Sequence, residues 1–502
     1  MTSNVEFSIS DYDRTDGQER ALEAKSKSCK SDCTARYEKK LKDLREANRG
    51  IKTDDNGTVY FDYMQFACYL KKRFTVIMYG GNPAVYNRKT GVYEYLSEDT
   101  IKNFFFEVLK ECKTKVWSIS KERLYYTCFM RNVTQYKSIE PNPNLLFFTN
   151  GTLDISSMKF SPHDEKNIAF AQLPYEYNPT AKAPIFEQTV ADIFNHDNSV
   201  IKVLQEAFGY SLYYGKHYPL QKIFIFRGNG RNGKSIIAEC LRNMLGHQNC
   251  SSTNIDDFQK SFGMQDIEGK YVNISEEKGM TKALDTSAFK AITGGDEIQV
   301  EKKYQNSYST KVYTKLFLLT NYPIVVNDAS FAFMNRLVIF KFDNQYIELP
   351  PNSKPKAGVK YMDKDLSVKL QAETQGIFNW ALQGLIRLMK NNWCLTESES
   401  IQNNVAHEYY HSNPVRHFYD CCIQKNVNGK VKTSDIHKDF IRWASTNHIE
   451  PFDITKNSRR FHELFRECLK GDGLQFKPVK SSEYYYKGIS LMNGWINITK
   501  WQ

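Results

Sequence analysis

The sequence predicts a multidomain α/β protein. Its 502 residues correspond to about three domains at roughly 150 residues each. Apolar runs alternate with helical stretches between residues 222 and 342, a pattern typical of a parallel sheet. A glycine-rich loop joins the first of these runs to a helix. The composition, 41% hydrophobic and 25% charged, excludes a largely disordered chain.

Changes in composition divide the chain into four segments. Residues 1–20 are interpreted as a loose polar arm and residues 35–48 as a solvated helix. Aromatic-rich alternation from residue 59 predicts an α/β domain, which the strand-and-helix region follows. The predicted divisions are an N-terminal arm and helix over 1–55, an N-terminal α/β domain over 56–184, a glycine-loop α/β domain over 185–395, and a connector with a C-terminal domain over 396–502.

The expected elements follow from periodicity and from turn residues. They are a hairpin over 84–96, helices over 100–112, 185–214 and 365–391, loops near 141–185 and 349–359, and strands over 222–227, 271–275, 315–320 and 337–342.

Charge and cysteine content restrict the class of protein. Lys and Arg number 68 against 57 Asp and Glu, a net charge of +11 that permits a nucleic-acid partner. The 11 cysteines form no CxxC pair, which indicates reduced thiols in a cytoplasm, and a zinc site at Cys29 and Cys33 is not expected without a second ligand pair.

No apolar run reaches the ~20 residues that span a bilayer, and residues 1–20 do not form a signal peptide, so we expect no membrane partner.

The strongest motif is a phosphate-binding loop. Its residues fit GxxxxGK[ST] between a strand and a helix: Gly228, Asn229, Gly230, Arg231, Asn232, Gly233, Lys234 and Ser235. Glycines let backbone N–H groups face a phosphate, and the helix N-terminus adds partial positive charge. We expect Lys234 to reach the β- and γ-phosphates of a nucleotide such as ATP, and the Ser235 hydroxyl to bind Mg²⁺.

Two carboxylates end the next predicted strand. Glu276 and Glu277 follow the β-prone run 271–275. In a P-loop fold the neighbouring strand delivers an acid to the metal, so we expect Glu276 to hold Mg²⁺ through water. Glu277 would polarise the attacking water. A solvated pair of glutamates at a strand end is the simpler alternative.

Two further polar residues follow in order. Asn321 ends the strand 315–320, where an amide can hydrogen-bond the γ-phosphate or the attacking water. Arg336 precedes the last strand, and a guanidinium binds phosphate in bidentate fashion. If a neighbouring subunit supplied it, Arg336 would act as an arginine finger. Taken singly, each residue is better explained by a structural role, and it is their order and spacing that favour the catalytic roles.

Taken together, these motifs resemble a superfamily 3 helicase of the AAA+ class. GNGRNGKS, Glu276–Glu277, the TGGD of residues 293–296, Asn321 and Arg336 are similar to the poxvirus-type and phage or plasmid primase-helicase family. The resemblance covers roughly residues 56–502. It implies a ring helicase, commonly a homo-hexamer, with ATP sites between subunits. The family's Arg-Arg pair is Asn335-Arg336 here, and no primase domain is evident in residues 1–55, so a separate primase or another replication protein is an open partner.

In such ring helicases a hairpin projects into the central pore of the ring, and the resemblance implies one here. EKKY, residues 301–304, is similar to its basic tip. Lys302 and Lys303 can follow phosphates and Tyr304 offers a face for a base, a combination that grips single-stranded DNA. An exposed basic hairpin without a partner is the alternative.

A second nucleic-acid signal lies at the C-terminus. Residues 413–502 hold 15 Lys and Arg against 9 Asp and Glu. Helices over 433–446 and 456–470 and a hairpin over 475–492 predict a winged helix. Arg459 and Arg460 lie early on the second helix, where bases or phosphates would be contacted, although a protein-binding winged helix fits the same pattern.

One motif indicates another chemistry. His407-Glu408-Tyr409-Tyr410-His411 fits HExxH, with His417 beyond it. Pro414 replaces the glycine that lets such a chain turn, and proline cannot take a positive φ, so we do not expect a metalloprotease.

The sequence thus favours an ATP-dependent DNA helicase or replication initiator of a phage, plasmid or other mobile element, working on single-stranded and forked or origin DNA in a bacterial cytoplasm. The alternative is an ATP-gated origin-binding or helicase-loading switch that does not unwind processively.

Overall fold

A computed structural model describes most of the chain. It describes all residues except 1–7, 15–16, 29–30, 137–138, 216–218, 255–256, 259, 261–262, 277–285, 302–307, 325–330, 350–355, 357, 448–456, 472, 475–483 and 493–502, and the side chains of residues 31–33 and 331. The chain divides into two compact units. Unit 1 comprises Met1–Ala181, Tyr213–Lys216 and Met244–Asn249, and unit 2 comprises Lys182–Leu212, His217–Asn243 and Cys250–Gln502.

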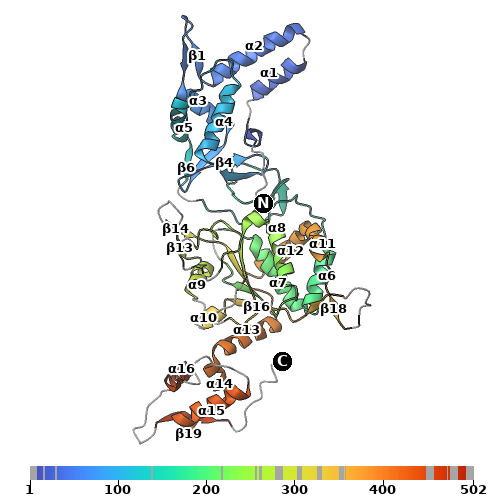
Figure 1. Ribbon diagram of the computed structural model, residues 1–502, viewed down its shortest axis with the longest axis vertical. Helices are drawn as coiled ribbons and strands as arrows, with labels where there is room; N and C mark the ends of the chain where they lie inside the picture. The colour runs from blue at the N-terminus through green and yellow to red at the C-terminus, as the bar shows by residue number, and fades with distance from the viewer. Residues whose placement is uncertain are drawn as a thin grey trace. The chain divides into compact units, whose positions relative to one another are not determined.

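Unit 1 is a mixed α/β unit whose helices pack on short sheets (Figure 1). The predicted hairpin over 84–96 and the predicted helix over 100–112 are confirmed as β4–β5 and α4. The elements are η1 (Ile9–Asp11), α1 (Gly17–Ser28), α2 (Ser31–Asn48), β1 (Ile51–Thr53), β2 (Val59–Phe61), α3 (Tyr63–Arg73), β3 (Val76–Tyr79), β4 (Asn82–Asn87), β5 (Val92–Tyr95), α4 (Glu98–Lys110), η2 (Ile119–Lys121), α5 (Glu122–Met130), β6 (Thr134–Tyr136), β7 (Leu145–Phe148), β8 (Gly151–Asp154), β9 (Lys159–Ser161) and η3 (His247–Asn249).

The N-terminal arm is more ordered than its composition predicts. Helix α1 begins at Gly17, and Glu19 on it is fully buried. The Glu19 carboxylate accepts hydrogen bonds from both terminal nitrogens of buried Arg49, at 3.3 and 3.2 Å. A buried charge is stable only when a partner neutralises it. This partner lies 30 positions along the chain, so local composition does not reveal it.

The expected loops near 141–185 are wrong in part. Strands β7, β8 and β9 form an antiparallel sheet there within the described residues. Leu146, Phe148 and Leu153 are buried in it. The Asn-Gly turn signal was present at residues 150–151, but the flanking runs are only three or four residues long.

Unit 2 is built on a parallel sheet, as the sequence predicts. Among the described residues it has five strands, in the order β11-β12-β15-β10-β16. Every pairing in it is parallel. The elements that precede the C-terminal domain are α6 (Pro184–Ile193), α7 (Asn198–Leu212), β10 (Ile223–Arg227), α8 (Lys234–Leu245), β11 (Cys250–Ser251), β12 (Val272–Glu276), α9 (Ser287–Gly294), β13 (Glu297–Val300), β14 (Tyr308–Lys311), β15 (Lys315–Thr320), α10 (Phe331–Met334), β16 (Leu337–Lys341), β17 (Tyr346–Ile347), β18 (Lys360–Tyr361), α11 (Leu366–Ala372), α12 (Thr374–Lys390) and α13 (Glu399–Ser412).

Both faces of this sheet are covered, which explains its continuous apolar strands. On one face Phe224 of β10 lies against Tyr210 of α7. Helices α7 and α12 pack so closely that a Cβ added at Gly209 would lie only 2.4 Å from the backbone nitrogen of Leu385, so only glycine fits there. On the other face Ile225 joins a core with Ile292 of α9. The predicted helical stretch over 185–214 is confirmed as α6 and α7, and the one over 365–391 as α11 and α12.

Helix α13 is tied to the sheet of unit 2 (Figure 1). The Asn404 side-chain amide donates to the Ile339 carbonyl of β16 at 3.0 Å. Val405 and Tyr409 pack on the sheet core. A separate core begins at Val415, so within the predicted segment 396–502 helix α13 is the connector and the C-terminal domain follows it.

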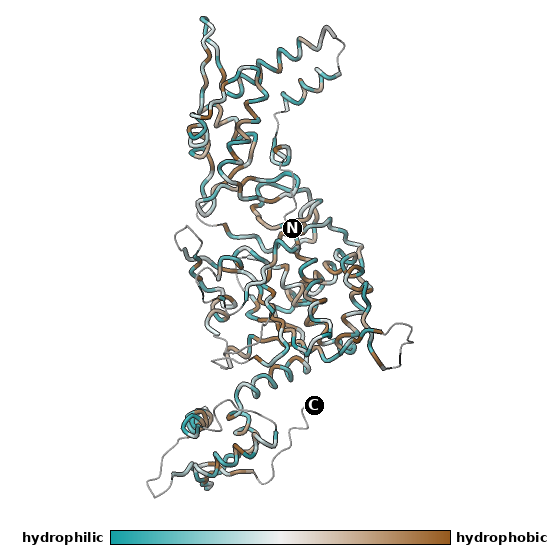
Figure 2. Tube along the Cα trace, viewed as in Figure 1, coloured by the Kyte–Doolittle hydropathy of each residue, from teal (hydrophilic) through white to brown (hydrophobic). Residues whose placement is uncertain are grey.

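The C-terminal elements form a small core of their own. They are α14 (Pro414–Cys422), β19 (Ile423–Lys432), α15 (Thr433–Thr446), α16 (Ser458–Gly471) and β20 (Tyr485–Leu491). The predicted helices over 433–446 and 456–470 are confirmed as α15 and α16. The hairpin predicted over 475–492 is corrected in its described part, because β20 pairs antiparallel with β19, while residues 475–483 lie outside the described residues. Figure 2 shows brown and teal alternating along α16, whose buried residues include Phe461 and Phe465.

Among the described residues no helix is both long enough and apolar enough to cross a bilayer.

Candidate functional site

The glycine-rich loop lies between β10 and α8, as predicted. Gly228 donates its N–H to the Thr320 carbonyl at 3.1 Å, which holds the loop start against β15. A Cβ on Gly228 would lie 2.1 Å from the Asn232 Nδ2 atom and 2.5 Å from the Phe342 oxygen, so only glycine fits. Gly230 and Gly233 have φ angles of +92° and +95°, which favour glycine.

The side chain of Asn232 fixes the middle of this loop. It is 3% exposed, and its Nδ2 donates to the Phe342 carbonyl after β16 at 3.1 Å. Its Oδ1 accepts a hydrogen bond from Lys234 Nζ at 3.2 Å. Asn232 therefore orients the lysine and anchors the loop at once.

Lys234 is held at the junction of the loop and Asn321. Its Nζ donates to Asn321 Oδ1 at 3.0 Å and to the Gly228 carbonyl at 2.5 Å. Burial lowers the pKa of this amine below its ordinary value. Neutral oxygens surround the amine, which leaves its charge available to an anion.

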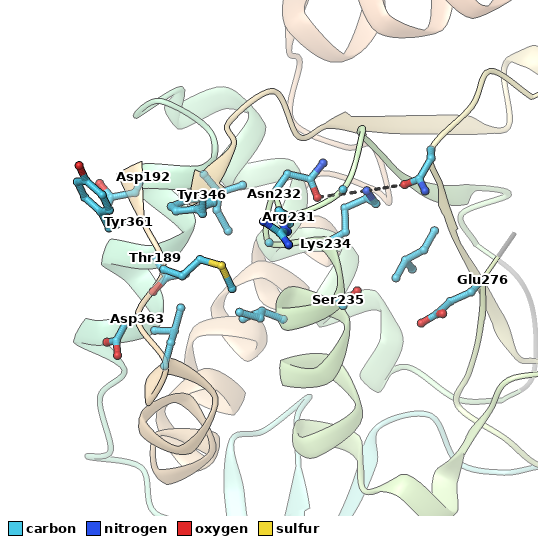
Figure 3. Close-up of a pocket in the computed structure, with 18 residues that line it drawn as sticks. Thr189, Asp192, Arg231, Asn232, Lys234, Ser235, Glu276, Tyr346, Tyr361 and Asp363 are labelled. Atoms are coloured by element: carbon cyan, nitrogen blue, oxygen red, sulfur yellow. Dashed lines mark hydrogen bonds between the residues drawn. The ribbon is translucent and has the colours of Figure 1, made fainter. Parts of the chain in front are cut away.

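A pocket of about 540 Å³ opens beside these residues (Figure 3). In Figure 3, Tyr361 lies at one end, Lys234 in the middle and Glu276 at the other end. The lining residues are Thr189, Asp192, Ile193, Gly230, Arg231, Asn232, Gly233, Lys234, Ser235, Ile236, Glu276, Leu319, Asn321, Tyr346, Tyr361, Met362, Asp363 and Leu366. The pocket thus brings together Lys234, Ser235, Glu276 and Asn321, which the sequence singled out separately.

The strand that carries Glu276 is not the neighbour of β10. The expectation that the adjacent strand delivers the acid is wrong, because β15 lies between β12 and β10. Glu276 pairs in register with Leu319, which pairs with Phe226 of β10. Strand order depends on long-range pairing, which local patterns do not reveal. Because the strands are parallel, Glu276 and Asn321 still end at the edge that holds the loop.

The far end of the pocket was missed by sequence reasoning. Tyr346 and Tyr361 lie on the short paired strands β17 and β18, with apolar Ile193 and Met362 nearby in the lining. The Tyr346 N–H donates to the Arg231 carbonyl at 2.8 Å, which joins this end to the glycine-rich loop. Two rings and aliphatic side chains form a surface on which a planar base can stack. Two-residue strands beside a loop give no sequence signal.

The residues present fit a nucleoside triphosphate with Mg²⁺. Ser235 is exposed at the N-terminus of α8, and Glu276 is exposed at the end of β12. A hydroxyl and a carboxylate are oxygen ligands of the kind Mg²⁺ prefers. The base-sized apolar end, the loop and the cation-binding oxygens follow one another along the pocket, in the order of the parts of a nucleotide.

Arg336 lies outside this pocket. Its carbonyl accepts from the Ile223 N–H at the start of β10, whereas the loop follows the end of that strand. Five residues at about 3.3 Å each separate the two edges by roughly 15 Å. Arg336 donates to Thr293 Oγ1 at 3.2 Å, to the Ala332 carbonyl at 2.6 Å and to Gln221 Oε1 at 3.1 Å.

Positive charge gathers around Arg336. In the described part of the chain no carboxylate pairs with this guanidinium. Lys222 lies beside it, and burial first and then Arg336 lower the pKa of Lys222. Such a half-buried, unneutralised pair of cations is suited to an anion that approaches from outside the subunit.

Several predicted residues lie outside the described residues. These are Glu277 and the hairpin tip Lys302, Lys303 and Tyr304. The base of that hairpin is described, since β13 and β14 pair antiparallel from Glu297 with Lys311 to Val300 with Tyr308.

Arg459 and Arg460 lie in the first turn of α16. Both guanidinium groups face Glu463, at 3.6 and 3.4 Å, and the side chains are 90% and 57% exposed. Exposed ion pairs are weak, so both arginines remain accessible to another anion.

The HExxH segment has its glutamate engaged in the fold. Glu408 is 1% exposed, pairs with Arg227 and accepts the Ile324 N–H. His417 stacks on Tyr410 with centroids 4.4 Å apart. Among the described residues no group of three His, Cys, Asp or Glu side chains is placed to hold a metal ion. Cys29 and the side chain of Cys33 lie outside the described part.

Two family descriptions match parts of the chain. Residues 71–195 match the family "D5 N terminal like". Residues 226–336, from the end of β10 to Arg336, match a family of unknown function, DUF5906. Among solved structures, the chain is similar to the A-form apo structure of the NrS-1 C-terminal region, with 12% identity, a TM-score of 0.47, and coverage of 84% of this chain and 97% of that one. A second structure of that region gives 12% identity and a TM-score of 0.45, with 84% and 98% covered.

Proposed function

We propose that this chain is an ATP-dependent DNA helicase or replication initiator of a phage or another mobile element, with a motor of the AAA+ superfamily 3 type. The observation that carries the proposal is a pocket that the glycine-rich loop, Glu276 and Asn321 line together. The family match over residues 71–195 supports the resemblance to the primase-helicase group.

The pocket residues have distinct roles in the proposed hydrolysis. Backbone N–H groups of the loop and the amine of Lys234 bind the phosphates, while Ser235 and Glu276 hold Mg²⁺. Held by these residues, a bound Mg²⁺ would supply positive charge that offsets the negative charge of the phosphates. Asn321 orients the γ-phosphate or the water, and Glu277 polarises that water.

The position of Arg336 supports a site shared between subunits. Roughly 15 Å of strand, at about 3.3 Å per residue, separates it from the loop of its own chain. A neighbouring copy in a ring would bring this unneutralised guanidinium to the γ-phosphate as an arginine finger. We propose a homo-hexamer on this basis.

DNA is proposed to contact two parts of the chain. The hairpin on β13 and β14 would carry Lys302, Lys303 and Tyr304 to a single strand. The order helix, strand, helix, helix, strand from α14 to β20 supports a winged helix, with Arg459 and Arg460 exposed on α16. Single-stranded, forked or origin DNA is the proposed partner, and a separate primase remains a candidate partner.

The test compares hydrolysis and unwinding in the purified chain. Lys234→Ala should lower kcat for ATP at least about a hundredfold, because a charge aimed at the transferring phosphate is worth several kcal/mol. Lys110→Ala removes an exposed lysine in unit 1 and should leave the rate unchanged. Wild-type turnover by folded Lys234→Ala would exclude the assignment. Hydrolysis without unwinding of forks of either polarity would favour the origin-binding or loading switch.

A further inference from the structure

The guanidinium of Arg336 is held by the helix that leads into the DNA-binding hairpin. Arg336 Nε donates to the hydroxyl oxygen of Thr293 at 3.2 Å. Thr293 lies in the last turn of α9 and is 1% exposed. Its own proton is donated to the Phe289 carbonyl at 2.7 Å, which turns a lone pair of the hydroxyl toward Arg336. The hydroxyl therefore has one orientation.

The helix and the hairpin are joined by a short, defined link. Gly295 caps α9 with φ +74°, and its N–H bonds back to Ala291 and Ile292. Strand β13 starts at Glu297, two residues later. A left-handed cap with two backbone hydrogen bonds leaves little freedom between helix and strand. A shift of the hairpin therefore moves the end of α9.

The three parts also share one core. Phe289 of α9 meets Phe333 of α10 edge to face with centroids 6.1 Å apart. Val300 at the base of the hairpin and Ile292 of α9 are fully buried in the same cluster as Phe333 and Met334. Arg336 follows Met334 by two residues. Packed cores transmit displacement instead of absorbing it.

We propose that Thr293 is a positioning residue that couples the hairpin to the arginine finger. Displacement of the hairpin by single-stranded DNA moves α9, and Thr293 carries the movement to Nε of Arg336, setting where the guanidinium meets the neighbouring subunit's γ-phosphate. This inference rests on the proposed trans role of Arg336. Thr293 itself touches neither nucleotide nor DNA.

The test measures kcat and KM for ATP with and without a single-stranded oligonucleotide. Thr293→Val keeps the shape and removes both hydrogen bonds. It should lower kcat about tenfold to a hundredfold, as expected for a misplaced catalytic group, and bring the ratio of DNA-stimulated to basal kcat close to one. KM should change less than about twofold, since the binding residues are untouched. Thr293→Ser should restore both quantities.

The matched control is Thr127→Val on α5. Thr127 makes the same hydroxyl bond to the carbonyl four residues earlier, to Arg123 at 2.7 Å, without a charged partner at its oxygen. It should leave kcat and the stimulation ratio at wild-type values. If both variants lose stability equally, that loss measures the removed hydrogen bond from the threonine hydroxyl to the helix carbonyl and not the role of Thr293. If Thr293→Val does not fold, the same kcat and stimulation ratio are measured in Thr293→Ala, which also removes both hydrogen bonds.

Mixed subunits separate the neighbouring-subunit effect from an effect within one chain. Thr293→Val subunits keep a complete pocket, and Glu277→Gln subunits keep a well-placed Arg336. Their mixture should exceed the sum of the separate rates. Wild-type kcat and stimulation in folded Thr293→Val would overturn the coupling. If Arg336→Ala also kept wild-type kcat, the arginine-finger role on which this inference rests would fail, whereas the ATPase assignment is tested separately by Lys234→Ala. If Arg336→Ala were inactive, only the role of Thr293 would be lost.

Discussion

Glu408 joins the two strand ends that frame the pocket beside the glycine-rich loop. Its carboxylate pairs with Arg227, the residue before Gly228, and accepts the N–H of Ile324, which lies three residues after Asn321. Glu408 is carried by α13, the helix that leads to the C-terminal domain. A buried carboxylate thus links the glycine-rich loop, the strand of Asn321 and the connector.

Glu408→Ala should lower the free energy of unfolding of unit 2 by about 3–5 kcal/mol, because it leaves the half-buried Arg227 without its counter-charge. Thermal unfolding checks this. Glu408→Gln combined with Arg227→Met should recover part of the loss, since glutamine still accepts the Ile324 N–H. Glu397→Gln, at an exposed residue just before the same helix, should leave the free energy of unfolding unchanged. An equal loss in the single and double variants would contradict the ion-pair explanation.

Tyr361→Ala should weaken nucleotide binding at the apolar end of the pocket. Stacking on an aromatic ring contributes about 1–3 kcal/mol per base, so the Kd for ATP should rise roughly fivefold to a hundredfold. The kcat at saturating ATP should change little. Titration with a fluorescent nucleotide analogue measures Kd, and Tyr60→Ala, at an exposed position of unit 1, is the control. An unchanged Kd would show that the nucleotide base does not bind at this end of the pocket.

The C-terminal domain should lose stability in mild acid. Burial lowers the pKa of both His417 and His462 to about 4, and His462 Nδ1 lies 2.9 Å from the Tyr486 hydroxyl. Between pH 6.5 and 4 the unfolded chain binds these protons more readily than the folded chain, so stability rises with pH over that interval and is lost as pH falls through it.

Circular dichroism melts between pH 4 and 7 measure this loss. His462→Gln should flatten part of the slope, because glutamine does not titrate. His196→Gln, at an exposed histidine outside the C-terminal domain, is the control. A slope identical in His462→Gln and wild type would contradict the assignment.

Arg459→Ala with Arg460→Ala should weaken binding to duplex DNA, and Glu463→Gln should strengthen it, because Glu463 holds both guanidinium groups. Loss of two phosphate contacts should reduce the slope of log K against log salt by about two. Fluorescence anisotropy at several salt concentrations gives both quantities. If neither change affects duplex affinity, α16 faces another partner.

Replacing Lys302, Lys303 and Tyr304 by alanine should abolish fork unwinding and leave basal ATP hydrolysis within a few-fold. These residues carry the charge and ring proposed to grip the strand, and none belongs to the phosphate-binding motifs. Fork-unwinding and ATP-hydrolysis assays on the same preparation measure both expected effects. Unwinding at the wild-type rate would exclude the hairpin as the DNA contact.

Local signals predicted many of the elements and the parallel sheet, but not the order of its strands or the long-range contacts. The strand 315–320 and the helix 433–446 match β15 and α15 to the residue, because a continuous apolar run and an amphipathic repeat are local properties. Strand β19 has the sequence IQKNVNGKVK, which lacks alternation, and it exists through its pairing with β20 some 60 residues later. Strand order, the Glu19–Arg49 pair and Tyr361 in the pocket likewise depend on distant segments.

The hydrogen bond between Lys234 and Asn321 would make the proposed site sensitive to the number of phosphates on a bound nucleotide. If the pocket binds ATP as proposed, the γ-phosphate would compete with Asn321 Oδ1 for the amine of Lys234, and the released amide could turn toward the phosphate or the attacking water. A diphosphate lacks this group, and the lysine ammonium has three N–H donors, so it can bind the β-phosphate and keep its bond to Asn321. We therefore expect two discrete arrangements of the same three side chains, Asn232, Lys234 and Asn321, selected by the length of the phosphate chain. Loss of the terminal phosphate would re-form the Lys234–Asn321 bond and favour release of the product.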